Sequence, residues 1–169
     1  MPFTPYHFGP SALVGLAFRR RIDVPVIVLV NVVMDFEPGL VMLLRLDYPL
    51  HGYIHTLLIG SFIGVLWAVC SFYFLRRFYI WLMNLLRLPY QPQFRSMLLA
   101  GILGVWLHVF LDSIMHSDIR PFWPIEANPL LQVISVSRLY LMCEYSIYAA
   151  FVLYVAILSV NYYRSKKTL

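Results

Sequence analysis

Histidines and acids recur along this chain at a spacing that points to metal chemistry. His51 and His55 lie four residues apart at the start of a long apolar stretch, in the run LHGYIHTLLIG. His108, Asp112 and His116 repeat the four-residue spacing near the end of another apolar stretch. Residues three or four apart share one face of a helix, so each group is predicted to present its side chains together.

Two further acids, Asp35 and Glu37, lie late in a third apolar stretch. An Asp at the centre of a membrane helix costs about 2.5–3.5 kcal/mol. The combined cost of burying several such groups without partners would exceed the net stability of a typical protein, about 5–15 kcal/mol. A shared divalent cation would neutralise the carboxylates and fix the imidazole tautomers. Imidazole nitrogens and carboxylate oxygens suit zinc, so the sequence predicts one or two ions of this kind.

A divalent ion with an open position lowers the pKa of water toward about 7 and so supplies a nucleophile at neutral pH. The predicted metal ligands are His7, Asp35, His51, His55, His108, Asp112 and His116. Catalytic roles are predicted for Asp35, for Glu37 as general base or bridging carboxylate, and for Arg120 as a contact for an anionic head group. His116 can instead lie beyond the helix end. Asp118 and Glu126 are interpreted as solvated loop charges.

The composition indicates the elements that must position these residues. The 169 residues are 61% hydrophobic and 12% charged, with a mean hydropathy of +0.74, whereas a soluble domain carries roughly 25% charged residues. Several apolar stretches approach or exceed the ~18 residues of a membrane span. We therefore expect an all-α integral membrane bundle that forms one domain over residues 1–169. The expected crossings are 24–46, 53–75, 97–115 and 139–163.

Shorter segments complete the predicted bundle. Residues 11–18 are too few to cross a bilayer and are interpreted as re-entrant or interfacial. Pro38 and Gly39 are expected to break or kink the first crossing. Residues 76–95 are aromatic and basic, and they predict an interfacial helix followed by a proline-containing turn.

The net charge of +5 is interpreted as a signal of topology, and no nucleic-acid partner is expected. Basic residues cluster at 19–21, 76–95 and 164–167. Four crossings place all three clusters on one side, which the positive-inside rule assigns to the cytoplasm. The histidine and acid clusters then lie toward the extracytoplasmic surface.

In order along the chain, these residues resemble the pattern of the YdjM-like family, which comprises small inner-membrane proteins described as metal-dependent hydrolases. The resemblance spans residues 7–124 and rests on His7, on DFE at 35–37, on HGYIHT at 51–56, on GVWLHVFLD at 104–112 and on PFWP at 121–124. The family pattern has an early His, Pro-Asp-x-Asp, His-Arg-Gly-x-Thr-His-Ser, Ser-His-x-x-x-Asp and a later Trp-Pro. The resemblance implies a metal-dependent hydrolase in a bacterial or archaeal inner membrane.

This chain departs from the family pattern around the metal-type residues. Glu37 replaces the second Asp, Met34 replaces the Pro, and Gly52 stands where Arg is expected. Tyr53 and Ile54 occupy the Gly-x positions. Leu57 and Leu107 replace the serines of the second and third segments. The resemblance therefore supports a metal site more than a shared substrate.

Three functions are compatible with the sequence. The first is a metal-dependent hydrolase that acts on a phosphoester or amide of a lipid or lipid-linked substrate at the outer membrane surface. The second is a non-catalytic assembly or regulatory module in which a closed metal site only joins the helices. The third is a small transporter or channel, because carboxylates and histidines within membranes also form ion pathways. Oligomeric state, metal identity and scissile bond stay open.

Overall fold

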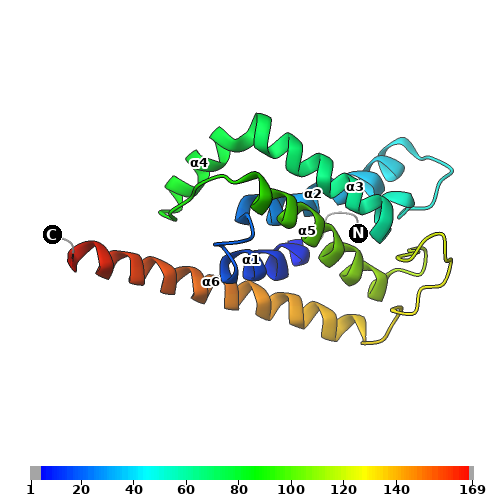
Figure 1. Cartoon of the computed structure of the whole chain (residues 1–169). Coiled ribbons are helices and arrows are strands. Elements are labelled where there is room, and N and C mark those ends of the chain that lie inside the picture. Colours follow the sequence, from blue (N-terminus) through cyan, green and yellow to red (C-terminus); the bar gives the residue numbers. More distant parts are fainter. Residues whose placement is uncertain (1–4, 168–169) are drawn as a thin grey trace.

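Long apolar helices make up most of the chain in a computed structural model that describes residues 5–167 (Figure 1). The helices are α2 (Val24–Leu44), α3 (Leu57–Cys70), α4 (Arg76–Leu85), α5 (Phe94–Met115) and α6 (Val136–Lys167). A π-helical segment, η3 (Ser71–Leu75), joins α3 to α4. Counting α3 to α4 as one, four helices are long and apolar enough to cross a membrane. No strand occurs within residues 5–167. The prediction of an all-α membrane bundle is confirmed.

The short N-terminal helix α1 (Phe8–Ala17) follows a 3-10 turn, η1 (Pro5–His7). It packs against α2 and α6, and at ten residues it is about 15 Å long, half the thickness of a bilayer core. Its buried face holds Gly9, Ser11, Gly15 and Leu16. The helix therefore lies inside the bundle and carries His7 at its start.

Helices α3 and α5 pack closely because glycines face each other across their contact. A Cβ on Gly64 would lie 2.6 Å from the carbonyl oxygen of Gly101, and a Cβ on Gly101 would clash with Gly64 in turn. Small residues of this kind let membrane helices approach at backbone distance. The contact fixes the start of α3 beside the last turns of α5.

Large apolar side chains point outward from the bundle. Leu43 is 77% exposed and Phe74 is 79% exposed. Contiguous exposed apolar surface is rare on soluble monomers and suits contact with lipid. The helices thus combine a lipid-type exterior with a polar interior at one end.

Of the break or kink predicted at Pro38, the break does not occur, because helix α2 continues through Pro38 to Leu44. A proline removes only one amide, and membrane helices tolerate that loss. A second local prediction is wrong. His51 and His55 do not lie on α3. His55 ends a 3-10 turn, η2 (Tyr53–His55), and α3 begins at Leu57, because the Thr56 hydroxyl accepts the Ile59 amide and caps the helix.

Candidate metal centre

All five histidines of the chain gather at one end of the bundle, where their rings form a continuous row. His7 stacks on His108 with 4.4 Å between centroids, and His108 lies 5.3 Å from His55. His55 contacts His51 at 4.9 Å, and His51 contacts His116 at 4.2 Å. The row draws on η1, α5, η2 and the loops beside them, so the convergence of separate segments predicted from the sequence is present.

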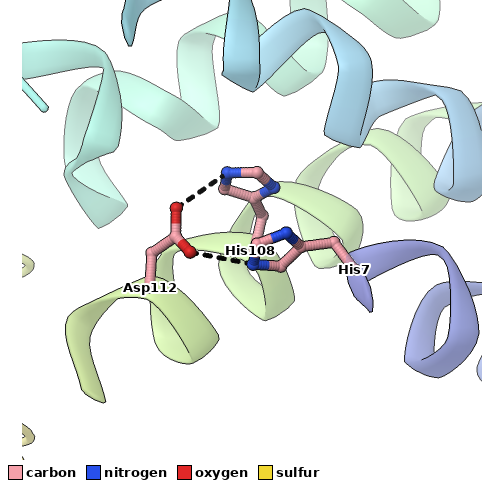
Figure 2. Close-up of side chains that lie close together, drawn as sticks. All are labelled: His7, His108 and Asp112. Atoms are coloured by element: carbon pink, nitrogen blue, oxygen red, sulfur yellow. Dashed lines mark ion pairs between the residues drawn. The ribbon is translucent and has the colours of Figure 1, made fainter. Parts of the chain in front are cut away.

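Asp112 lies at the centre of this row and is only 3% exposed. Its Oδ1 is 2.8 Å from His7 Nε2, and its Oδ2 is 3.2 Å from His108 Nε2 (Figure 2). His55 Nε2 is 3.9 Å from the same Oδ2. Asp35 approaches from α2, with its Oδ1 3.8 Å from His108 Nε2. One carboxylate therefore faces three imidazoles, and a second lies next to them.

Glu37 orients His55 by contacting the ring nitrogen that faces away from Asp112. Its Oε2 lies 2.7 Å from His55 Nδ1 and accepts the Gly52 amide at 3.1 Å. Its Oε1 accepts the Ile54 amide at 3.3 Å. A carboxylate that holds Nδ1–H leaves the Nε2 lone pair directed into the cluster, as in carboxylate–histidine–metal arrangements. Glu37 thus supports His55 and fixes the turn on which His55 lies.

Asn31 orients the ring of His108 in the same way, through a contact with its Nδ1. Its Nδ2 donates to the Ser11 hydroxyl at 2.9 Å and to the Val28 carbonyl at 2.9 Å. These acceptors fix which end of the amide is oxygen, so Oδ1 faces His108 Nδ1 at 3.2 Å and accepts a hydrogen bond from it. The other ring nitrogen, His108 Nε2, then faces Asp112.

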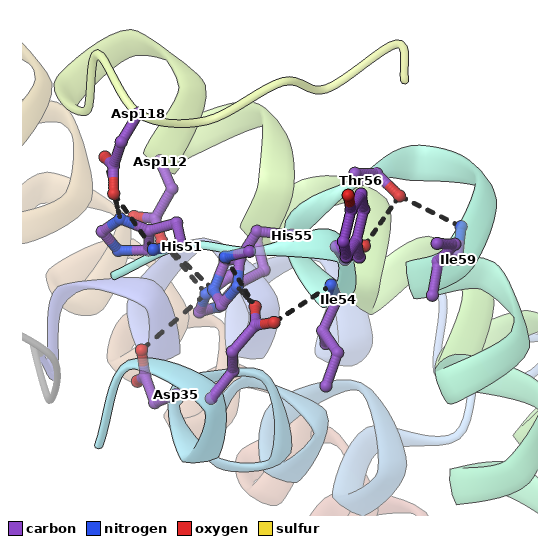
Figure 3. A network of polar contacts seen from close by, with 12 residues as sticks. Asp35, His51, Ile54, His55, Thr56, Ile59, Asp112 and Asp118 are labelled. Atoms are coloured by element: carbon purple, nitrogen blue, oxygen red, sulfur yellow. Dashed lines mark hydrogen bonds and ion pairs between the residues drawn. The ribbon is translucent and has the colours of Figure 1, made fainter. Parts of the chain in front are cut away.

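Asp118 supports His51 from the loop after α5 (Figure 3). Its Oδ2 accepts the His51 amide at 3.0 Å, and both oxygens lie 3.1 Å from His51 Nδ1. Burial acts to raise the pKa of Asp118, but the contacts with His51 outweigh it and hold that pKa below its ordinary value. Burial and the nearby His55 and His116 lower the pKa of His51. His51 is therefore neutral at pH 7, which is the form that binds metals.

Two buried imidazole nitrogens in the cluster have an unused capacity for hydrogen bonding or metal binding. His55 Nε2 and His108 Nε2 have no hydrogen-bond partner among the described residues. Their contacts with Asp112, at 3.9 and 3.2 Å, lack hydrogen-bond geometry. Buried polar atoms without partners are rare and call for an explanation such as an ion. A divalent cation between these nitrogens and the carboxylate fits the donor set.

Two groups of three ligand atoms could hold such a cation, with all atoms of a group within 4.8 Å of one another. The inner group is His7, His108 and Asp112, all buried. The outer group is His51, His116 and Asp112. Ligands around zinc lie about 3.3 Å apart in a tetrahedron, so small inward movements suffice. Asp112 belongs to both groups.

A pocket of about 380 Å³ lies beside the outer group. His51, Asp118 and Arg120 line it, together with the aromatic rings of Tyr48, Tyr53 and Trp123. Arg120 Nη1 pairs with Glu126 at 2.9 Å, and both side chains are exposed. The pocket gives the outer end of the row access to the surroundings.

The structure brings together every metal ligand predicted from the sequence, including His7 and His116. Asp118 was interpreted as a solvated loop charge, and it is an exposed residue of the loop after α5, but its carboxylate also contacts His51, which that interpretation did not include. Asn31 was overlooked, although its position four residues before Asp35 on α2 places both on one helix face. Arg120 lies at the pocket and does not touch the histidine row.

Comparison with known proteins gives no assignment, because no protein-family model, curated protein or solved structure matches this chain. The resemblance to the YdjM-like family therefore stays a prediction that depends on the residues quoted for it.

Proposed function

We propose that this protein is a metal-dependent hydrolase of the YdjM-like type that acts on a lipid or lipid-linked substrate. We further propose that the two ligand groups that share Asp112 would hold two divalent cations, zinc in the simplest case. The observation that carries the proposal is that two three-ligand groups share Asp112. Paired ions that share a carboxylate are common in enzymes that hydrolyse phosphoesters. The site would face the extracytoplasmic side of an inner membrane.

Bound cations would supply a Lewis acid and activate water at neutral pH. The chain's own residues then have separate tasks. Asn31, Glu37 and Asp118 hold the imidazole tautomers. Glu37 was predicted as general base, but three donors engage its oxygens, so we assign it to positioning His55. Asp35 forms no hydrogen bond within residues 5–167, and its Oδ1 lies 3.8 Å from His108 Nε2. We therefore assign to Asp35 the role of proton acceptor.

The pocket beside the outer group supports a substrate of amphipathic character. Its aromatic residues, Tyr48, Tyr53 and Trp123, are of the types that concentrate at membrane–water interfaces. Arg120 supplies a positive charge at the same rim. A phosphoester or amide head group could enter here while its apolar part stays in the membrane.

A closed, non-catalytic metal site is the alternative, and one observation favours it. The cluster joins η1 to α5 through the His7–Asp112 contact and joins η2 to α2 through His55 and Glu37. A metal here could therefore serve only to hold the helices together. The presence of the pocket favours the enzyme, because a structural site needs no access.

The test is a hydrolysis screen of the purified, zinc-loaded protein on a total bacterial lipid extract, read by mass spectrometry of the products. The wild type should cleave at least one lipid class, and Asp112→Asn should be inactive. Asp47→Asn is the matched control, because Asp47 is an exposed acid outside the pocket lining. A structural metal would instead give no cleavage and a fold that is lost with a chelator.

A further inference from the structure

A second polar pocket, of about 360 Å³, lies at the opposite ends of α2 and α5 from the metal-type cluster. Arg19 and Arg20, from the segment between α1 and α2, line one side. Gln91, Gln93 and Ser96, from the turn before α5 and its first residues, line another. The start of α2 is about 16 Å from Asp35 along the helix. This pocket is therefore separate from the candidate metal centre.

An apolar groove of about 330 Å³ adjoins this basic pocket. Its lining comes from α1, α2, α6 and the end of α4, and includes Leu16, Leu29 and Phe151. Val24 and Met83 line both spaces. The two thus form one composite site that is polar and basic at one end and apolar at the other, which we call the basic–apolar site.

The positive charge of the basic–apolar site comes from arginine side chains that are not paired with an acid. Arg19 and Arg20 are exposed and form no ion pair within residues 5–167. The acid in the lining, Asp23, is buried and already engaged. Its Oδ1 accepts the Val26 amide at 3.2 Å, and its Oδ2 accepts the Tyr90 hydroxyl at 2.7 Å. The two guanidinium groups are therefore left to bind an anion.

We propose that the basic–apolar site binds one anionic phospholipid, with its phosphate at Arg19 and Arg20 and an acyl chain in the groove. Basic pockets between membrane helices on the cytoplasmic side bind acidic head groups, and residues 19–21 form one of the clusters that the positive-inside rule assigns to that side. A free anion would leave the adjoining groove unexplained, and an uncharged lipid would leave the arginines unused. The inference does not depend on the proposed hydrolase activity.

Native mass spectrometry of the detergent-solubilised protein tests this proposal, with dioleoylphosphatidylglycerol and dioleoylphosphatidylcholine as probes. The wild type should bind the anionic lipid more tightly. A basic residue near an anionic lipid contributes roughly fivefold in affinity, so Arg19→Gln with Arg20→Gln should weaken that binding about 30-fold. Binding of the neutral lipid should change little. The control pair, Arg76→Gln with Arg77→Gln, removes exposed arginines outside the site and should bind as the wild type does.

A second variant probes the apolar half. Leu29→Trp fills the groove and should weaken binding of both lipids, while the thermal unfolding midpoint of the variant in detergent reports that the protein is folded. Three results would overturn the proposal. They are equal affinity of the wild type for the two lipids, an equal loss in the control pair, and full displacement of the anionic lipid by millimolar inorganic phosphate. The last result would indicate a simple anion site.

Discussion

Replacing Glu37 by glutamine should weaken metal binding through His55 without any direct loss of a ligand. The two oxygens of Glu37 accept three hydrogen bonds, from the amides of Gly52 and Ile54 and from His55 Nδ1. Glutamine offers one oxygen and one NH₂ group in their place. Whichever way the amide turns, at least one of the three donors faces another donor.

The size of the effect follows from that mismatch. A buried donor without a partner costs about 1–3 kcal/mol of stability. If the NH₂ group faces His55, the imidazole must accept at Nδ1, and its proton moves to Nε2, which then no longer offers a lone pair to a metal. Loss of a supporting contact of this kind typically lowers metal affinity 10- to 100-fold, or about 1.4–2.7 kcal/mol.

The assay is competition for zinc against a fluorescent chelator, with thermal unfolding of the same samples in detergent. Glu37→Gln should show the 10- to 100-fold loss and a lower unfolding midpoint. Glu126→Gln removes an exposed carboxylate near the pocket and should match the wild type. Wild-type zinc affinity in Glu37→Gln would refute the supporting role of Glu37.

Three further predictions concern other parts of the same account. Asn31→Leu removes the acceptor for His108 Nδ1 and should lower zinc affinity about 10-fold or more, whereas Asn31→Asp, which keeps an acceptor, should lose less; equal losses in a zinc titration would contradict this. Burial lowers the pKa of His51 and of His116 below 6.5, so the unfolded chain binds more protons below that pH. The metal-free protein should thus be fully stable above about pH 6.5 and lose stability as pH falls below it; an unfolding midpoint that is equal near pH 7.5 and near pH 5.5 would argue against buried, neutral imidazoles. Gly101→Leu places a side chain against the backbone of α3 and should destabilise the fold by about 1–3 kcal/mol or more, seen as a lower unfolding midpoint, while Leu99→Ala on the exposed side of α5 should have little effect.

The membrane helices could be predicted from sequence because their signal is one of length and composition. The 18-residue apolar threshold locates all four candidate membrane-spanning helices. The ends of three of them shift by at most three residues, but the second continues through η3 and α4 to Leu85, ten residues beyond its predicted end. The effect of Pro38 could not be predicted this way, since it depends on whether neighbouring groups tolerate the missing amide.

The gathering of the histidines could also be predicted, because isolated imidazoles and acids are too costly inside a membrane to lie apart. The contact between His51 and His55 was predicted correctly, but from a helix face on which neither residue lies. They meet through a 3-10 turn that Glu37 holds, and not through the face of a helix.

The residues that support the ligands were the hardest to predict. Asn31 is a neutral amide in an apolar helix, and its cost is too small to demand a partner by itself. Asp118 follows α5 in a loop, where no periodicity relates it to His51, 67 positions away. Contacts of this kind depend on the path of the loop, which the sequence pattern does not specify.

The most direct test of the central claim is the zinc content of the purified protein, measured per chain by plasma mass spectrometry, for the wild type and for Asp112→Asn prepared in parallel. If Asp112 joins two ligand groups around cations, the wild type should retain roughly two zinc ions per chain after dialysis, and the variant should retain almost none. A wild type that retains no metal, or a variant that retains as much as the wild type, would contradict the account.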